Sequence, residues 1–230
     1  MSGDVLRWKD YRSVPWRNGG GVTQEVASSG DVVRELASSG EVVGELASST
    51  DVSAPPAPRE SAGGFDWRVS VADVEAEGPF SSFPGIDRVI TAVEGAGMVL
   101  TVDGVPRTVG PLSPFTFSGA AVTDCRLVAG RVRNLNVMTR RERARAQVRI
   151  VTVASESSES SESSESSVEA ECAEGETLLV MATTEGVVVG GPNGRETALG
   201  RLDCVRREGR GVLTLRGDGV VAEIRITGMP

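Results

Sequence analysis

The chain of 230 residues contains no histidine at all. This absence excludes a Ser-His-Asp triad, a Cys-His dyad and every metal site that depends on histidine ligands. Aromatic residues are also scarce, at 4% of the chain, so the core is expected to be aliphatic. Chemistry in this protein must therefore depend on carboxylates, guanidinium groups, amides and hydroxyls.

Cysteine is almost as rare, with three residues at 125, 172 and 204 and no CxxC pair. An odd number at wide spacing predicts reduced, structural thiols and no disulfide framework or zinc site. No apolar run approaches the ~20 residues of a membrane span, and the N-terminus shows no signal-peptide core. These features predict a cytoplasmic protein that does not associate with membranes.

The net charge of −8 arises from one segment. Eight acidic residues and no basic ones lie between Ser155 and Glu176, and outside that segment acidic and basic residues are equal in number, at 24 each. The remaining chain carries no basic excess to attract nucleic acid. We therefore expect no nucleic-acid partner.

Short valine-rich segments separated by turns every eight to twelve residues predict an all-β sandwich or barrel. Asp103-Gly104 between two such segments is a hairpin signal. The predicted strands include 67–72, 89–93, 98–102, 105–109, 115–117, 124–128, 132–138, 177–183, 186–190, 200–206, 211–216 and 220–227.

Two segments are predicted to be insertions. Residues 27–63 hold a near-identical decapeptide repeat (ASSGDVVREL, ASSGEVVGEL) followed by a Pro/Gly/Ser linker. Residues 154–176 are an acidic Ser/Glu stretch without aromatics, which cannot bury enough surface to fold alone. We expect a disordered loop in the second segment. Either segment could instead recruit a protein partner.

The strand that begins at Trp67 has two different faces. Trp67, Val69 and Val71 share one face, and Arg68, Ser70 and Ala72 share the other. The second face is either a surface with its arginine in water or the lining of a ligand cavity in a barrel. Both interpretations remain open at this point.

Other segments also allow two interpretations. The glycines at 19–21 suggest either a bulged turn that leads into the strand 22–26 or a phosphate-binding loop that lacks the GK[ST] signature. The alternating arginines in 141–152 indicate a charged edge strand or a basic surface for an anionic partner. The alternating spacing of Asp73, Glu75 and Glu77 favours a solvated face over a catalytic site.

One set of polar residues suits a carboxylate or formyl-like ligand. Arg68, Arg88, Asn136 and the loop 18–23 supply guanidinium, amide and hydroxyl donors. Asp87 precedes Arg88, and a turn aspartate can orient an arginine. The set includes no obvious nucleophile or base, so no catalytic residue is assigned.

Five motifs in order resemble the HutD family, also called HutD/Ves. They are PWRNGGGVT (15–23), FDWRVSVADVEAEGPFSSFPGIDR (65–88), EGAGMVL (94–100), PFTFSG (114–119) and RNLNVMTRR (133–141). The resemblance covers about the first 140 residues apart from the insertion.

The resemblance implies an all-β, two-barrel cupin-type fold, or bicupin. The expected domains are an N-terminal cupin-like barrel at 1–140 and a smaller C-terminal β domain at 141–230. Many cupins bind a metal through histidines and a glutamate, but this chain has no histidine, so neither a metal nor another cofactor is expected. Phe83, Phe115 and Phe117 are expected in the core.

The family is associated with bacterial histidine utilisation, where it is thought to regulate the pathway by binding an intermediate. The resemblance implies a small carboxylate ligand such as formylglutamate, formiminoglutamate or urocanate. The motif residues expected to line the pocket are Asn18, Thr23, Arg68, Ser70, Arg88 and Asn136. The alternative is a metal-independent isomerase or hydrolase of a similar anion, with Asp87 or Glu94 as its acid–base group. A homodimer is possible.

Overall fold

Strands make up almost all of the regular structure in this protein. The computed structural model describes residues 4–16, 21–29, 64–154, 167–190 and 195–229. In these ranges, one short 3-10 helix, η1 (Trp8–Asp10), accompanies nineteen strands. Predictions about the decapeptide repeat and most of the acidic stretch lie outside the described residues.

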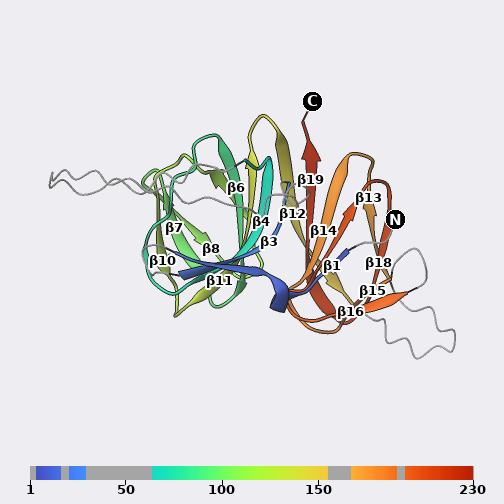
Figure 1. Cartoon of the computed structure of the whole chain (residues 1–230). Coiled ribbons are helices and arrows are strands. Elements are labelled where there is room, and N and C mark those ends of the chain that lie inside the picture. The colour runs from blue at the N-terminus through green and yellow to red at the C-terminus, as the bar shows by residue number, and fades with distance from the viewer. Residues whose placement is uncertain (1–3, 17–20, 30–63, 155–166, 191–194, 230) are drawn as a thin grey trace, which may run out of the picture.

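The N-terminal half contains two sheets that face one another (Figure 1). A six-stranded sheet has the order β2-β3-β4-β11-β6-β9, and a four-stranded sheet has the order β5-β10-β7-β8. The strands are β2 (Arg12–Pro15), β3 (Gly21–Ser28), β4 (Trp67–Val74), β5 (Gly78–Pro79), β6 (Ile86–Glu94), β7 (Met98–Val102), β8 (Val105–Val109), β9 (Phe115–Ser118), β10 (Thr123–Leu127) and β11 (Val132–Arg140).

The C-terminal half repeats this arrangement with a five-stranded sheet, β1-β17-β14-β19-β12, and a four-stranded sheet, β13-β18-β15-β16. The strands are β1 (Asp4–Leu6), β12 (Ala144–Val153), β13 (Val168–Cys172), β14 (Glu176–Ala182), β15 (Val187–Gly190), β16 (Glu196–Leu199), β17 (Cys204–Glu208), β18 (Gly211–Gly217) and β19 (Gly219–Gly228). The predicted all-β, two-barrel fold is therefore confirmed.

The larger sheets of the two halves pack against each other through an apolar core. Val71 and Leu135 from the N-terminal half share a cluster with Leu179, Met181 and Ile224 from the C-terminal half. These side chains occupy the faces of β4, β11, β14 and β19 that point away from each barrel's own interior. The alternate residues of β4 and β11 are thereby directed into the N-terminal barrel.

The predicted hairpin at Asp103-Gly104 is confirmed. Both residues have positive φ, 48° and 81°, and they join β7 to β8. This geometry matches the type I′ turn, whose twist suits antiparallel strands. The predicted charged edge strand is also confirmed, because β12 is the last strand of its sheet and Arg145 and Arg149 are exposed.

Several predicted boundaries are wrong. Residues 168–172 form β13 with Ala170 and Cys172 buried, so the acidic stretch does not remain a loop as far as residue 176. Ala27 and Ser28 complete β3, so the first insertion begins later than predicted. The predicted strand 200–206 includes a turn held by Asp203, and the strand itself runs from Cys204 to Glu208.

The start of the chain joins the opposite half from the one predicted. β1 pairs with β17, so residues 4–6 extend the C-terminal sheet and not the N-terminal barrel. Asp203 stabilises the residues that follow β1. It accepts hydrogen bonds from the Trp8 amide at 2.8 Å and from Arg7 Nη1 at 2.6 Å. The division of the chain into two domains at residue 140 stays a prediction.

The three cysteines are free and buried, in agreement with their predicted structural role. Burial raises the pKa of the Cys125 thiol to about 12. No helix among the described residues has the length and apolar character needed to cross a membrane.

Candidate functional site

The strands β4, β11 and β6 bring four of the predicted ligand-binding residues together. Met138 on β11 is the register partner of both Arg68 on β4 and Arg88 on β6, and Asn136 is the partner of Ser70. Directly opposed residues of neighbouring strands share a face, so all five side chains lie on the inner face of the sheet. Because the two arginines are two strand spacings apart, about 10 Å, both guanidinium groups can reach a single small anion.

Arg88 is the more enclosed of the two arginines, with 7% of its surface exposed. Its Nε and Nη2 both donate to Asn136 Oδ1 at 3.2 Å. Its guanidinium carbon also lies 5.1–5.6 Å from the ring centres of Phe80, Phe83 and Phe117. Such rings stabilise a desolvated cation through their electron-rich faces. The surroundings therefore hold a positive charge inside the barrel.

Arg68 is half-buried on the neighbouring side of Met138. Its Nη2 contacts Met138 Sδ at 3.1 Å, and its guanidinium carbon lies 5.0 Å from the centre of the Phe65 ring. The first of the two interpretations of β4, an arginine in open water, is therefore wrong for this strand. Arg68 and Arg88 together create a positive inner face.

Ser70 adds a hydroxyl to this face. Its residue exposure is 1%, and its Oγ has no hydrogen-bond partner among the described residues. A buried hydroxyl left unsatisfied costs about 1–3 kcal/mol. A ligand that supplied a hydrogen bond here would recover this free energy.

The remaining two predicted residues, Asn18 and Thr23, come from the motif at 15–23. Thr23 faces the same way as Ser70 in the sheet register, but its Oγ1 accepts a hydrogen bond from Trp16 Nε1 at 2.8 Å. Thr23 thus has a structural partner already. Asn18 lies outside the described residues, together with Gly19 and Gly20.

The bulged turn predicted at the three glycines lies largely outside the described residues. Gly21 is a regular member of β3, and a separate register shift falls between Glu25 and Ala27. The reason for glycine is a close approach, since a Cβ at position 21 would lie 2.1 Å from the Asp73 carbonyl oxygen.

The sequence reasoning missed two residues beside the predicted site. Glu25 is the register partner of Ser70, and its half-buried carboxylate is on the same side of the sheet. Phe80 supplies one of the three rings around Arg88. Alternation from Thr23 could have identified Glu25, whereas no local signal connects Phe80 with Arg88.

The carboxylates proposed for acid–base catalysis point away from this face. Asp87 does not orient Arg88, because it lies within β6, where successive side chains take opposite faces, and it pairs with Arg141 at 2.7 Å. Glu94 pairs with Arg133 at 2.9 Å. Asp73, predicted to be solvated, also pairs with Arg133, at 2.6 Å, and this hydrogen bond raises the pKa of Arg133.

A metal does not fit the inner face. Two guanidinium cations repel a metal ion, and the groups beside them are the Ser70 hydroxyl, the Asn136 amide and a single carboxylate, that of Glu25. Among the described residues, no group of three or more His, Cys, Asp or Glu side chains is arranged to hold a metal. The face is instead suited to an anion with hydrogen-bonding atoms.

The family model named HutD matches residues 8–222. The chain belongs to the HutD family. A relative from Pseudomonas putida, an uncharacterised 21.2 kDa protein in the hutC 3′ region, is 32% identical over 89% of this chain and 86% of its own length. Protein Ves from Citrobacter koseri is 35% identical over 63% of each chain.

Solved structures agree with this family membership. HutD from Pseudomonas fluorescens, in a formate condition, has a TM-score of 0.70 at 31% identity, covering 99% of this chain and all of that chain. A conserved protein of unknown function from Pseudomonas aeruginosa has a TM-score of 0.73 at 26% identity, with 99% and 100% coverage. Protein Ylba from E. coli, at 8% identity and a TM-score of 0.63 with 97% and 89% coverage, shares the fold alone. The fold of this HutD-family chain is all-β, with two cupin-type barrels.

Proposed function

We propose that this chain binds a small carboxylate metabolite inside its N-terminal barrel, without a metal, and that it regulates histidine utilisation through this binding. The candidate ligands are formylglutamate, formiminoglutamate and urocanate. Arg68 and Arg88 pair with the carboxylate in this proposal. Asn136 and Ser70 orient the ligand.

The observation that carries the proposal is the environment of Arg88. A guanidinium group that is desolvated among three aromatic rings and oriented by Asn136 is expensive to bury. Its alignment with Arg68 across Met138 provides two cations on one inner face. Charge-assisted hydrogen bonds to a carboxylate are strong and directional, and a planar guanidinium matches that geometry.

Two relatives support the link to the pathway and to carboxylates. The Pseudomonas putida relative is encoded in the hutC 3′ region. The Pseudomonas fluorescens HutD structure was determined in a formate condition, and formate is the smallest carboxylate. Formate would be the minimal probe of the site in this chain.

The test is a calorimetric and thermal-shift titration with formate, N-formylglutamate, formiminoglutamate, urocanate and histidine. A ligand at about 100 times its dissociation constant adds roughly 2.7 kcal/mol to the free energy of unfolding, which is a readily measured shift in melting temperature. Arg88→Met keeps an unbranched apolar stem but removes the guanidinium group and its charge. We expect affinity at least about tenfold weaker in Arg88→Met and in Arg68→Ala, because each loses a charge-assisted contact.

Arg141→Ala is the matched control, since Arg141 is exposed and pairs with Asp87 on the opposite side of the sheet. Its affinity should equal that of the wild type. Circular dichroism would verify that every variant is folded. Wild-type affinity in both Arg88→Met and Arg68→Ala would overturn the proposal, as would the lack of any thermal shift with all five compounds.

The alternative, a metal-independent enzyme, now depends on Glu25, because Asp87 and Glu94 are engaged elsewhere. It predicts that the protein consumes a bound ligand, which proton NMR can monitor. It also predicts that Glu25→Gln loses this turnover. Unchanged ligand spectra after prolonged incubation with the wild type would favour binding alone.

A further inference from the structure

A second polar site lies in the C-terminal barrel, on strands that contribute nothing to the first site. A cavity of about 280 Å³ is lined by Gln147, Arg149, Glu223 and Arg225. The first two residues belong to β12 and the others to β19, and Gln147 is opposite Arg225 as Arg149 is opposite Glu223. The volume is just below the range of pockets for drug-sized ligands, so it suits a smaller molecule.

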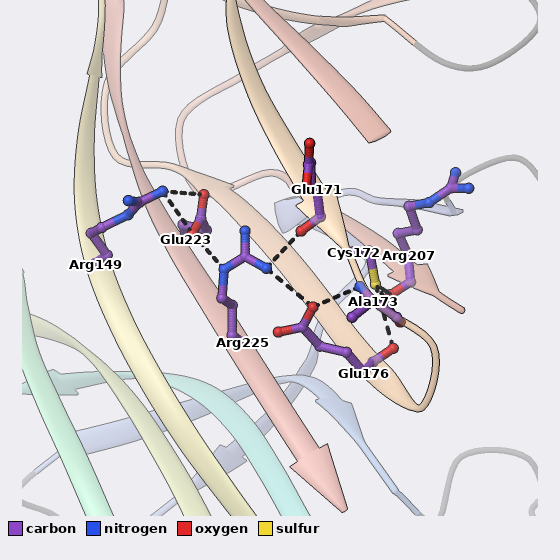
Figure 2. Close-up of polar contacts among 8 residues, drawn as sticks. All are labelled: Arg149, Glu171, Cys172, Ala173, Glu176, Arg207, Glu223 and Arg225. Atoms are coloured by element: carbon purple, nitrogen blue, oxygen red, sulfur yellow. Dashed lines mark hydrogen bonds and ion pairs between the residues drawn. The ribbon is translucent and has the colours of Figure 1, made fainter. Parts of the chain in front are cut away.

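A buried carboxylate organises this cavity (Figure 2). Glu223 has only 2% of its side chain exposed, and both of its oxygens lie 3.1 Å from Arg149 Nη2. Arg225 Nε donates to the same carboxylate at 2.8 Å. Glu223 therefore holds two guanidinium groups in fixed positions.

Arg225 is held on its other side as well. Its Nη1 donates to the Glu171 carbonyl at 2.6 Å and to Glu176 Oε2 at 3.1 Å (Figure 2). Burial alone would lower the pKa of Arg225, but the hydrogen bonds to Glu223 and Glu176 raise it. Arg225 thus links β19 to β13 of the facing sheet and remains charged.

This arrangement is costly as a purely structural device. Val221, two residues before Glu223 on the same strand face, packs in the apolar core of this barrel. Replacing a buried charged group such as Glu223, together with its partners, by well-packed apolar residues is often neutral or stabilising. The triad therefore suggests a role beyond stability.

The side chains at the opening retain donors for a ligand. Arg149 is 60% exposed, and among the described residues only its Nη2 has a partner, which leaves Nε and Nη1. The Gln147 amide likewise has no partner within the described ranges, and it can both donate and accept. The lining holds two arginines and one glutamate, and the Glu176 carboxylate balances the charge of Arg225 from outside the lining, so Arg149 is the cation that remains accessible.

We propose that this cavity is a second binding site, for a small organic anion that carries a carboxylate and a further hydrogen-bonding group. The carboxylate accepts from Arg149, whose orientation Glu223 fixes, and the second group contacts the Gln147 amide. The site is independent of the Arg68 and Arg88 face. The proposal for this cavity can therefore be tested independently of the function proposed above.

Titration of ¹⁵N-labelled full-length protein with glycolate tests the proposal, because glycolate has one carboxylate and one hydroxyl. Sodium chloride at matched ionic strength provides the salt reference. We expect saturable shifts at the amides of residues 147, 149, 223 and 225. Arg149→Gln should raise the dissociation constant for glycolate at least about tenfold, because it removes a charge-assisted contact.

Arg145→Gln is the matched control, since Arg145 is exposed on the same face of β12, two residues before Gln147, and does not line the cavity. It should bind glycolate at this cavity with the affinity of the wild type. Shifts that do not saturate, or saturable shifts that persist unchanged in Arg149→Gln, would overturn the proposal.

Discussion

Gly21 begins β3 at a point where its backbone passes close to β4. A Cβ there would lie 2.1 Å from the carbonyl oxygen of Asp73, and backbone cannot move aside as a flexible side chain can. The third glycine of the NGGG motif is therefore fixed by the distance between two strands that position Thr23 and Ser70.

Gly21→Ala is expected to destabilise the protein by about 1–3 kcal/mol, the typical cost of overpacking a buried position. Chemical denaturation followed by circular dichroism measures this change. Gly110→Ala serves as the control, because nothing lies within 4 Å of a Cβ at that position. Equal denaturation midpoints for the two variants would show that the close approach of β3 and β4 does not make position 21 intolerant of a larger residue.

At the scale of an element, Asp203 attaches the first strand to the C-terminal half. Burial alone would raise the pKa of this carboxyl, but the hydrogen bonds from the Trp8 amide, Arg7 and the Gly200 amide outweigh burial and lower it. A carboxyl whose folded pKa is lowered stabilises the fold above its unfolded pKa of about 3.9, and that stabilisation disappears as the pH falls through the folded value.

Asp203→Asn should therefore lower the free energy of unfolding by about 1–3 kcal/mol at pH 7, because charged hydrogen bonds are lost. The difference from the wild type should shrink below about pH 4, where the wild-type carboxyl also becomes neutral. Urea denaturation between pH 3 and pH 8 gives the measurement. Asp124→Asn, an exposed position on β10, is the control, and a pH-independent difference for Asp203→Asn would contradict the assignment.

At the scale of the whole molecule, one apolar core joins the two barrels. Leu135 has no exposed surface and packs in the cluster that also contains Leu179 and Ile224. Because residues of both halves complete the same core, neither larger sheet can expose its packed face without cost. We expect the two halves to unfold together.

Leu135→Ala should cost about 2–5 kcal/mol, as large-to-small changes in cores do. Each kcal/mol should lower the melting temperature by roughly 2–4 °C in a protein of this size. Differential scanning calorimetry should show a single transition for both proteins, shifted in the variant. Two separate transitions, of which only one moved, would mean that the barrels unfold independently.

The sequence alone determined the strand pattern and the alternation of β4. Trp67, Val69 and Val71 could be assigned to one face because side chains of a strand alternate strictly, and Asp103-Gly104 specified its turn through local backbone preferences. The motifs of the N-terminal half also identified the family. Each of these signals is local, so no distant contact was needed to interpret it.

Only the tertiary structure decided which polar residues meet. Strand order places β11 between β4 and β6, and that order makes Met138 the neighbour of both Arg68 and Arg88. The same dependence on pairing sends β1 to the C-terminal sheet and brings Arg149 to Glu223. Asp87 is adjacent to Arg88 in sequence but faces the other side, because contact across a sheet depends on register and not on proximity along the chain.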